Sequence, residues 1–281
     1  MKKIIFTVIG IAIVLSSVWI WSNTELIRDT VQHYAENGEF LTLEARYSAE
    51  QIMQAQKELL LQNEKYSYRD PSLCFYPYLL MEVKYTGPAQ KTKEGVILWS
   101  MVDGEMVIDT FNWDKTHGFE DALNAQASEE DFHLMQILAR YRGSLTKPRL
   151  AKELQVDPEM LDLIVASSTR KHLVIERGAE VQLHFQNPRI DVDPSTRINQ
   201  WLVSKPYSHA QQASKRYSRS QIEKTAKAAF GKDFTVRNSR EVFLPVYKLE
   251  VLNPDESILT TYWNALNGKP LDETRYLSQG Q

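Results

Sequence analysis

The amino-terminal pattern is apolar and uncharged. The run from Ile4 to Trp21 contains no charged residue, whereas two lysines precede it and acidic residues prevail from Glu25 to Glu39. Its eighteen residues would span about 27 Å as an α-helix, close to the roughly 30 Å hydrocarbon core of a bilayer. The charge asymmetry indicates that residues 1–3 form a cytoplasmic tail. The pattern therefore predicts a transmembrane anchor over 4–21, with the rest of the chain outside the cytoplasm.

Two alternatives stay open for this segment. Val14-Leu15-Ser16 is a tolerable cleavage site for a signal peptide, although the apolar run continues beyond it to Trp21. The apolar part of a signal peptide usually covers only about 7–15 residues. The other alternative is a helix buried in a globular fold. The length favours a retained signal anchor that passes once through a bacterial-type inner membrane and leaves the body of the protein in the periplasm.

Residues 22–67 carry apolar positions at helical spacing. Ser48-Ala49-Glu50-Gln51 has the spacing of a capping box, and apolar residues from Ile52 to Leu61 follow it at intervals typical of a helix. The pattern is too short to indicate a coiled coil. We predict a helical stalk over 22–67.

Residues 68–127 contain apolar runs typical of strands. The run from Leu79 to Tyr85 is one of them, and Asp103-Gly104 lies between two others, Gly95–Val102 and Met106–Phe111. Asp-Gly between two apolar runs is the strongest short signal for a β-hairpin. A helix is predicted to start at Phe119. These elements predict a small β-hairpin-containing α+β domain.

Residues 128–203 combine three helices with a hairpin. An amphipathic helix is predicted from Glu129 to Tyr141, and two further helices are predicted after the capping residues Thr146 and Asp157. Two strands then flank the turn Arg177-Gly178. This order of elements predicts a compact unit with a β-hairpin at its end.

The unit resembles a winged-helix domain over about residues 128–185. The positions that carry the resemblance are Ile137-Leu138-Ala139, Gly143, Leu145-Thr146, Leu150-Ala151, Leu154, Leu161 and Leu173. Such domains insert their third helix into the major groove of DNA or bind other proteins. Here the third helix opens with Asp157, Glu159 and Asp162, whose charges would repel phosphates. The resemblance therefore implies a protein-interaction or structural role, and nucleic acid is disfavoured as a partner.

The C-terminal part begins with a polar segment, 204–219, that we interpret as a linker. The last predicted domain, 220–281, opens with a helix ended by Gly231 and continues with strands interrupted at Pro245. Over about residues 220–271 this unit resembles a PepSY-type module, on the helix, the strands and Tyr262-Trp263-Asn264-Ala265-Leu266-Asn267-Gly268-Lys269. Asn264 stands where that family commonly has Asp. The resemblance implies a helix beside an antiparallel sheet.

The predicted fold class is thus α+β. It comprises an N-terminal transmembrane helix, a helical stalk, the small domain over 68–127, the winged-helix-like domain over 128–203 and a C-terminal helix-plus-antiparallel-sheet domain. A hydrophobic content of 43% and a charged content of 25% exclude wholesale disorder. The single cysteine, Cys74, excludes an intrachain disulfide and a multi-cysteine metal site.

One loop concentrates candidate chemistry. Asp114, His117, Glu120 and Asp121 fall between the predicted hairpin and the helix that follows it. A histidine with nearby carboxylates can hold a metal or act as a general base. The competing interpretation is a helix start, with Asn112, Asp114 or Thr116 as the cap. The spacing matches no standard metal motif, and no catalytic signature surrounds the loop, so we expect no metal or other cofactor.

Charge is unevenly distributed although the net charge is only −3. Residues 197–248 hold eleven Lys or Arg against three Asp or Glu, whereas residues 103–140 hold nine acids against two bases. The basic stretch can bind an anionic partner or pair with the acidic stretch of the same chain. The candidate interaction surface is Lys205, Lys215, Arg216, Arg219, Lys224 and Lys227.

These observations favour a membrane-anchored, extracytoplasmic binding or assembly protein without an evident catalytic site. It would contact the membrane through Ile4 to Trp21 and bind a protein or an envelope polymer. One alternative is a membrane-tethered winged-helix transcriptional regulator that faces the cytoplasm. A second alternative is a hydrolase or metal-binding protein that uses the His117 loop.

Overall fold

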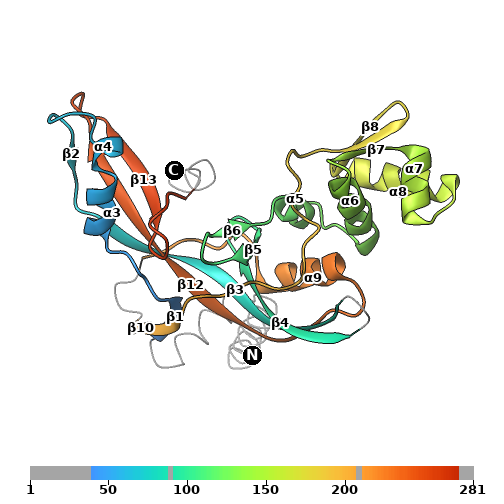
Figure 1. Cartoon of the computed structure of the whole chain (residues 1–281), viewed down its shortest axis with the longest axis horizontal. Helices are drawn as coiled ribbons and strands as arrows, with labels where there is room; N and C mark the ends of the chain where they lie inside the picture. Colours follow the sequence, from blue (N-terminus) through green and yellow to red (C-terminus); the bar gives the residue numbers. More distant parts are fainter. Residues whose placement is uncertain (1–38, 88–90, 207–210, 272–281) are drawn as a thin grey trace, which may run out of the picture. The chain divides into compact units, whose positions relative to one another are not determined.

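The computed structural model describes residues 39–87, 91–206 and 211–271. Residues 39–40 and 204–206 group apart from the others, so the body considered below is formed by residues 41–203 and 211–271. The helices are α3 (Ala49–Ala55), α4 (Lys57–Leu60), α5 (Phe119–Asn124), α6 (Glu129–Arg140), α7 (Lys147–Leu154), α8 (Pro158–Arg170) and α9 (Arg219–Phe230) (Figure 1). The strands are β1 (Glu39–Leu43), β2 (Ser67–Tyr68), β3 (Ser72–Thr86), β4 (Thr92–Ser100), β5 (Met106–Asp109), β6 (Asp114–Lys115), β7 (Ser144–Thr146), β8 (Val174–Arg177), β9 (Glu180–Leu183), β10 (Leu202–Pro206), β11 (Gln211–Gln212), β12 (Thr235–Leu252) and β13 (Ile258–Asn264).

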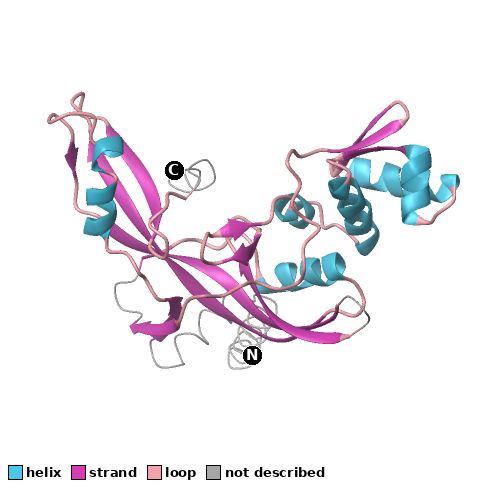
Figure 2. Cartoon of the chain, viewed as in Figure 1, coloured by secondary structure: helices cyan, strands magenta, loops and turns pink. Residues whose placement is uncertain are grey.

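Two long strands, β3 and β12, form the centre of a curled mixed sheet. They pair antiparallel from Thr235 opposite Lys84 to Pro245 opposite Phe75. The strand order runs β1-β12-β3-β4-β5-β6, and β13 pairs with the second half of β12 (Figure 2). Parallel pairing of β1 with β12 and of β11 with β3 makes the sheet mixed.

The sheet is buried on both faces along β3. Leu79 and Met81 belong to one apolar cluster, whereas Tyr78 and Leu80 belong to another. Successive side chains of a strand point to opposite faces, so the continuous apolar run of β3 supplies both clusters. This burial explains why the run shows no polar alternation.

Helices α5, α6 and α9 share the first of these clusters with the sheet. The ring of Trp99, in β4, meets Phe119 of α5 edge-on at 4.8 Å between centroids. The ring of Phe119 also packs against that of Phe230 in α9, with 6.2 Å between the ring centroids. The aromatic contacts hold the helices against the strands that precede them in the chain.

The segment from α6 to β9 has the order of elements expected from the winged-helix resemblance. Three helices are followed by the hairpin β8–β9, and β7 completes a three-stranded sheet in the order β7-β9-β8. Asp131 of α6 accepts a hydrogen bond from Ser168 of α8 at 2.6 Å and forms an ion pair with Lys171. Burial by itself would raise the pKa of Asp131, but these hydrogen bonds outweigh it and lower that pKa below 3.8.

The predicted fold class is wrong in its membrane and stalk elements. The predicted anchor over 4–21 lies outside the described residues, and no helix within residues 39–87, 91–206 and 211–271 is both long and apolar enough to cross a bilayer. The membrane, single-pass and signal-anchor descriptions find no support in the described residues, which form an α+β fold. Within 22–67, the described part holds strands β1 and β2 around the short helices α3 and α4 instead of a continuous stalk.

The C-terminal helix-plus-sheet unit is also not separate. The strands predicted on either side of Pro245 form one strand, β12, which pairs with β3 from the predicted small domain. Proline is tolerated at this point because β12 changes partners beside it, with β3 paired up to Pro245 and β13 paired from Val246. One sheet therefore replaces two predicted ones.

Candidate functional site

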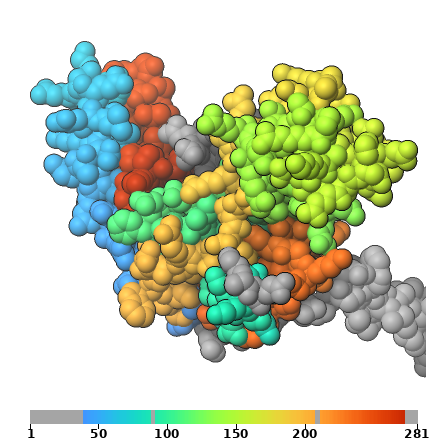
Figure 3. Space-filling model, turned by 45° about the vertical axis from the view of Figure 1, so that its right-hand side comes forward, coloured from blue at the N-terminus to red at the C-terminus, as the bar shows by residue number. Residues whose placement is uncertain are grey.

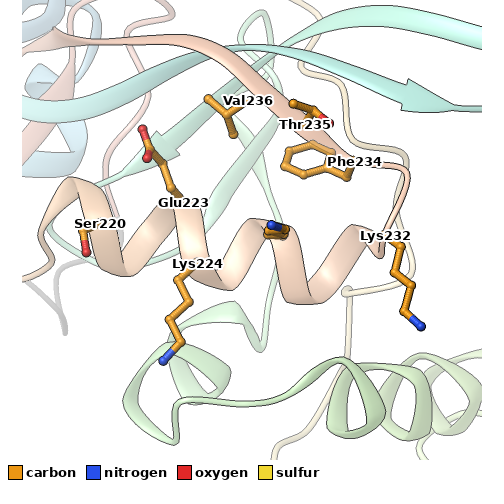
Figure 4. Close-up of a pocket in the computed structure, with 8 residues that line it drawn as sticks. Ser220, Glu223, Lys224, Lys232, Phe234, Thr235 and Val236 are labelled. Atoms are coloured by element: carbon orange, nitrogen blue, oxygen red, sulfur yellow. The ribbon is translucent and has the colours of Figure 1, made fainter.

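A basic groove of about 480 Å³ lies along α9 and the start of β12. Its lining residues are Ser220, Glu223, Lys224, Lys227, Lys232, Phe234, Thr235 and Val236 (Figure 4). We call it the α9 groove. In the close-up, Lys224 and Lys232 extend to the same side of α9, whereas Glu223 extends to the opposite side. The orange surface of this region is exposed in the space-filling view (Figure 3).

The local sequence explains this arrangement. Ser218 and Gln221 form a capping box that begins α9, and the buried face of the helix consists of Ile222, Thr225, Ala226 and Ala229. Because an α-helix has 3.6 residues per turn, Lys224 and Lys227 fall on the exposed face. Gly231 ends the helix at a φ of 83°, a conformation that favours glycine. Lys232 follows directly and extends the same basic surface.

The three lysines of the α9 groove form no ion pair with any residue that the structure describes. Lys224, Lys227 and Lys232 are exposed, and no carboxylate of the described chain lies within 4 Å of their Nζ atoms. The one acid in the lining, Glu223, accepts hydrogen bonds from Arg219 at 3.0 Å and from the Ser239 hydroxyl. The groove therefore has three lysines against one glutamate in its lining, and that glutamate is held by Arg219 and Ser239.

The predicted basic surface divides into two groups. Lys215 pairs with Glu241, Arg216 pairs with Glu120 at 2.5 Å, and Arg219 pairs with Glu223. Lys205 belongs to the other compact unit, with residues 204–206. Only Lys224 and Lys227 of the predicted set line the groove. Lys232, which sequence reasoning missed, joins them, and its position just after the helix-ending Gly231 was the available signal.

The four candidate residues of the His117 loop contact different partners. Asp114 lies 3.5 Å from the Arg189 guanidinium, and Glu120 pairs with Arg216. His117 pairs through its backbone with Arg189, and its ring meets Phe185 edge-on at 6.0 Å between centroids. Asp121 is half-buried in the first turn of α5. In the part of the chain that the structure describes, no three His, Cys, Asp or Glu side chains gather as a metal site would require.

A buried carboxylate that sequence reasoning missed organises this loop. Glu105 is 1% exposed, and it accepts hydrogen bonds from the backbone N–H groups of Gly118, Phe119 and Glu120 and from the Thr116 hydroxyl. Burial raises the pKa of Glu105 above 4.5 against the opposing effect of these hydrogen bonds. The helix start predicted here is confirmed, but the capping group comes from Glu105 and not from the loop itself. In the sequence, the only signal for this role was the position of Glu105 directly after Asp103-Gly104.

The exposed face of α8 is acidic and apolar. Glu159 and Asp162 lie beside the large side chains of Met160 and Leu163, which are 48% and 66% exposed. Asp157 caps the helix by accepting a hydrogen bond from the Met160 N–H at 2.8 Å. A helix with this surface is unsuited to phosphate contacts.

Comparison with known proteins returned no relative: no family model, no curated protein and no solved structure matches the chain.

Proposed function

We propose that this protein is a non-enzymatic binding protein whose α9 groove takes an acidic segment of a protein partner. The observation that carries the proposal is a set of three exposed lysines around one groove, Lys224, Lys227 and Lys232, which form no ion pair within the described part of the chain. Exposed lysines steer an oppositely charged partner and set its orientation more than they add affinity. Val236, which is half-buried, adds an apolar side chain to the lining, whereas Phe234 is buried in the core and leaves little surface for a partner.

The charge distribution of the rest of the body supports a directed interaction. Arg216 is neutralised by Glu120, and Lys215 by Glu241, so these parts of the basic stretch serve internal packing. Within residues 197–248, the lysines of the α9 groove are among the cations that form no ion pair with a described carboxylate. An acidic segment would therefore meet three of these exposed cations together at the groove.

The α8 surface favours a protein partner over nucleic acid. A winged-helix regulator would present its third helix to DNA, but this helix exposes Glu159, Asp162 and Leu163. The regulator and the hydrolase of the His117 loop both stay predictions that the proposal does not use. The extracytoplasmic location likewise stays a prediction.

Binding of a fluorescein-labelled, glutamate-rich peptide to the full chain tests the proposal. The test variant combines Lys224→Gln, Lys227→Gln and Lys232→Gln, and the matched control combines Lys57→Gln, Lys65→Gln and Lys152→Gln, which are exposed lysines outside the groove. Both variants lower the net charge equally. Fluorescence anisotropy should show about tenfold weaker binding for the groove variant and little change for the control.

Two outcomes would contradict the proposal. Equal weakening in both variants would assign the attraction to overall charge. Tighter binding of a DNA duplex or of anionic vesicles than of the peptide, under the same salt conditions, would assign the groove to another class of partner.

A further inference from the structure

A second, smaller cavity lies where the end of β13 meets the loop before β6. Its volume is about 100 Å³, and it is independent of the α9 groove. Its lining residues are Asn112, Trp113, Lys115, Asn264, Asn267, Lys269, Pro270 and Leu271. All of them are polar donors, cations or apolar groups, and no carboxylate is among them. We call it the Asn264 cavity.

Asn264, one of the lining residues, has a deeply buried side-chain amide. The residue is 1% exposed, and its side-chain Nδ2 has no hydrogen-bond partner among the residues that the structure describes. Its Oδ1 accepts a hydrogen bond from the Leu266 N–H at 2.8 Å. That bond fixes the orientation of the amide, because the reverse orientation would set two donors against each other. A buried donor without an acceptor is rare, so we expect a ligand or a water molecule to supply the acceptor here.

Trp113 contributes a second donor. It is 8% exposed, and its ring meets Tyr78 edge-on at 5.4 Å between centroids. Burial raises the pKa of the Tyr78 phenol and the nearby Trp113 N–H acts against that rise, but the Nε1 has full hydrogen-bond geometry with no described acceptor. The backbone of Trp113 has a φ of 59°, which is uncommon for a bulky residue. Two buried N–H donors thus belong to side chains that line the same small cavity.

The charge around the cavity is positive. Lys269 is exposed and forms no ion pair with a described carboxylate, whereas Lys115 is held by Asp103 at 2.6 Å. Lys269 also belongs to the turn that closes on Asn264, since its C=O accepts from the Asn264 N–H at 2.9 Å. One free cation and two neutral donors suit an anionic acceptor better than a neutral one.

We propose that the Asn264 cavity binds the carboxylate group of a short ligand. A carboxylate offers two acceptor oxygens to the N–H groups of Asn264 and Trp113, and its charge complements Lys269. The size limits the ligand, because a water molecule in liquid takes about 30 Å³ and the cavity would hold only a few atoms. Pro270 and Leu271 provide apolar wall for a short carbon tail. Acetate and propionate are the free forms of this chemistry, and the end of a peptide chain is the other source.

Nuclear magnetic resonance of the ¹⁵N-labelled full chain tests this site. The Trp113 indole signal is assigned by its loss in Trp113→Phe, and the wild-type protein is titrated with acetate. We expect a saturable shift of that signal with a Kd of about 1 mM or weaker, since so few atoms can make contact. A tripeptide with a free C-terminus, compared with its C-terminal amide, then distinguishes a chain end from a free carboxylate.

Two variants and one matched control test the assigned residues by calorimetry. Asn264→Asp replaces the Nδ2 donor with a repelling oxygen and should abolish acetate binding. Asn63→Asp is the control, because Asn63 likewise accepts a hydrogen bond from the N–H two residues later but lies outside the cavity. If Asn264→Asp fails to fold, the exposed Lys269→Gln serves instead and should weaken binding about threefold to tenfold.

The proposal is overturned by either of two results. Absence of a saturable shift with both acetate and the tripeptide at about 50 mM would mean that the cavity holds only water. An equal shift with chloride would mean that it binds anions without regard to the carboxylate group.

Discussion

The carboxylate of Glu105 accepts a hydrogen bond from the backbone N–H of Gly118 at 3.0 Å, across thirteen positions of the chain. The bond joins the hairpin β4–β5 to the first turn of α5. The start of a helix carries unsatisfied N–H groups and partial positive charge, so a buried carboxylate stabilises it. The contact also closes the loop in which Asp114 and His117 lie, and this makes the loop a structural element as much as a candidate site.

Glu105→Gln should change how stability depends on pH. Burial raises the pKa of Glu105 above 4.5 in the folded state, so the folded protein binds the proton of Glu105 more tightly than the unfolded chain does. The stability gained from that preference is complete below pH 4.5 and is lost as the pH rises through the raised pKa. Urea unfolding at several pH values should show the free energy of unfolding of the wild type falling relative to the variant across that window. If the free energy of unfolding of the wild type instead rises relative to that of the variant as the pH rises, this account is wrong.

Asp131→Asn should show the opposite dependence. The pKa of Asp131 lies below 3.8, so its stabilising contribution is present above pH 3.8 and is lost as the pH falls through the lowered pKa. At neutral pH the variant should lose about 2 kcal/mol, because Lys171 and Ser168 would keep only weaker partners. The same denaturation series, with the exposed Asp70→Asn as control, should show the difference shrinking in acid. A constant difference would show that the charge of Asp131 is not what stabilises the fold.

Gly104→Ala should cost more than Gly178→Ala. Both glycines have a positive φ, 73° and 60°, so an added Cβ strains the backbone by about 1–2 kcal/mol at either position. At Gly104 the Cβ would also come within 2.9 Å of Leu123 and Tyr217, whereas at Gly178 nothing lies within 4 Å. Steric overlap in a packed core adds about 1–3 kcal/mol. Thermal unfolding of the two variants measures the difference, and equal losses would place the whole cost in the backbone.

Leu161→Ala and Leu163→Ala should separate the core of α8 from its surface. Leu161 is 2% exposed, and its truncation should cost about 2–5 kcal/mol through lost burial and the cavity it leaves. Leu163 is 66% exposed and should change stability by less than about 0.5 kcal/mol. Chemical denaturation of both variants tests the assignment of the α8 face. A large loss for Leu163→Ala would show that this leucine is packed in solution and that the face is not free.

Local signals in the sequence predicted local structure well. Ser48 and Gln51 form the predicted capping box, and Asp103-Gly104 lies between the strands β4 and β5 as predicted. The hairpin β8–β9 likewise surrounds the predicted turn at Arg177-Gly178. Such features depend on residues a few positions apart, whose chemistry decides the backbone conformation without help from distant parts of the chain.

The candidate sites were only partly accessible to such signals. Lys224 and Lys227 were predicted for the basic surface, but a run of charges cannot show that Arg216 is neutralised by Glu120 far away in the sequence. The Asn264 cavity joins residues of β13 and its turn to the loop at Trp113. No spacing in the sequence reports that approach, since the sheet creates it.

By itself the sequence determined where helices begin, where turns lie and which segments carry the apolar residues of the core. Only the tertiary structure decided that β3 and β12 share one sheet, that Glu105 caps α5, and which lysines keep their charge free. The physical reason is that capping and turn chemistry act over a few residues, whereas strand pairing and ion pairing depend on which distant segments the burial of apolar surface brings together.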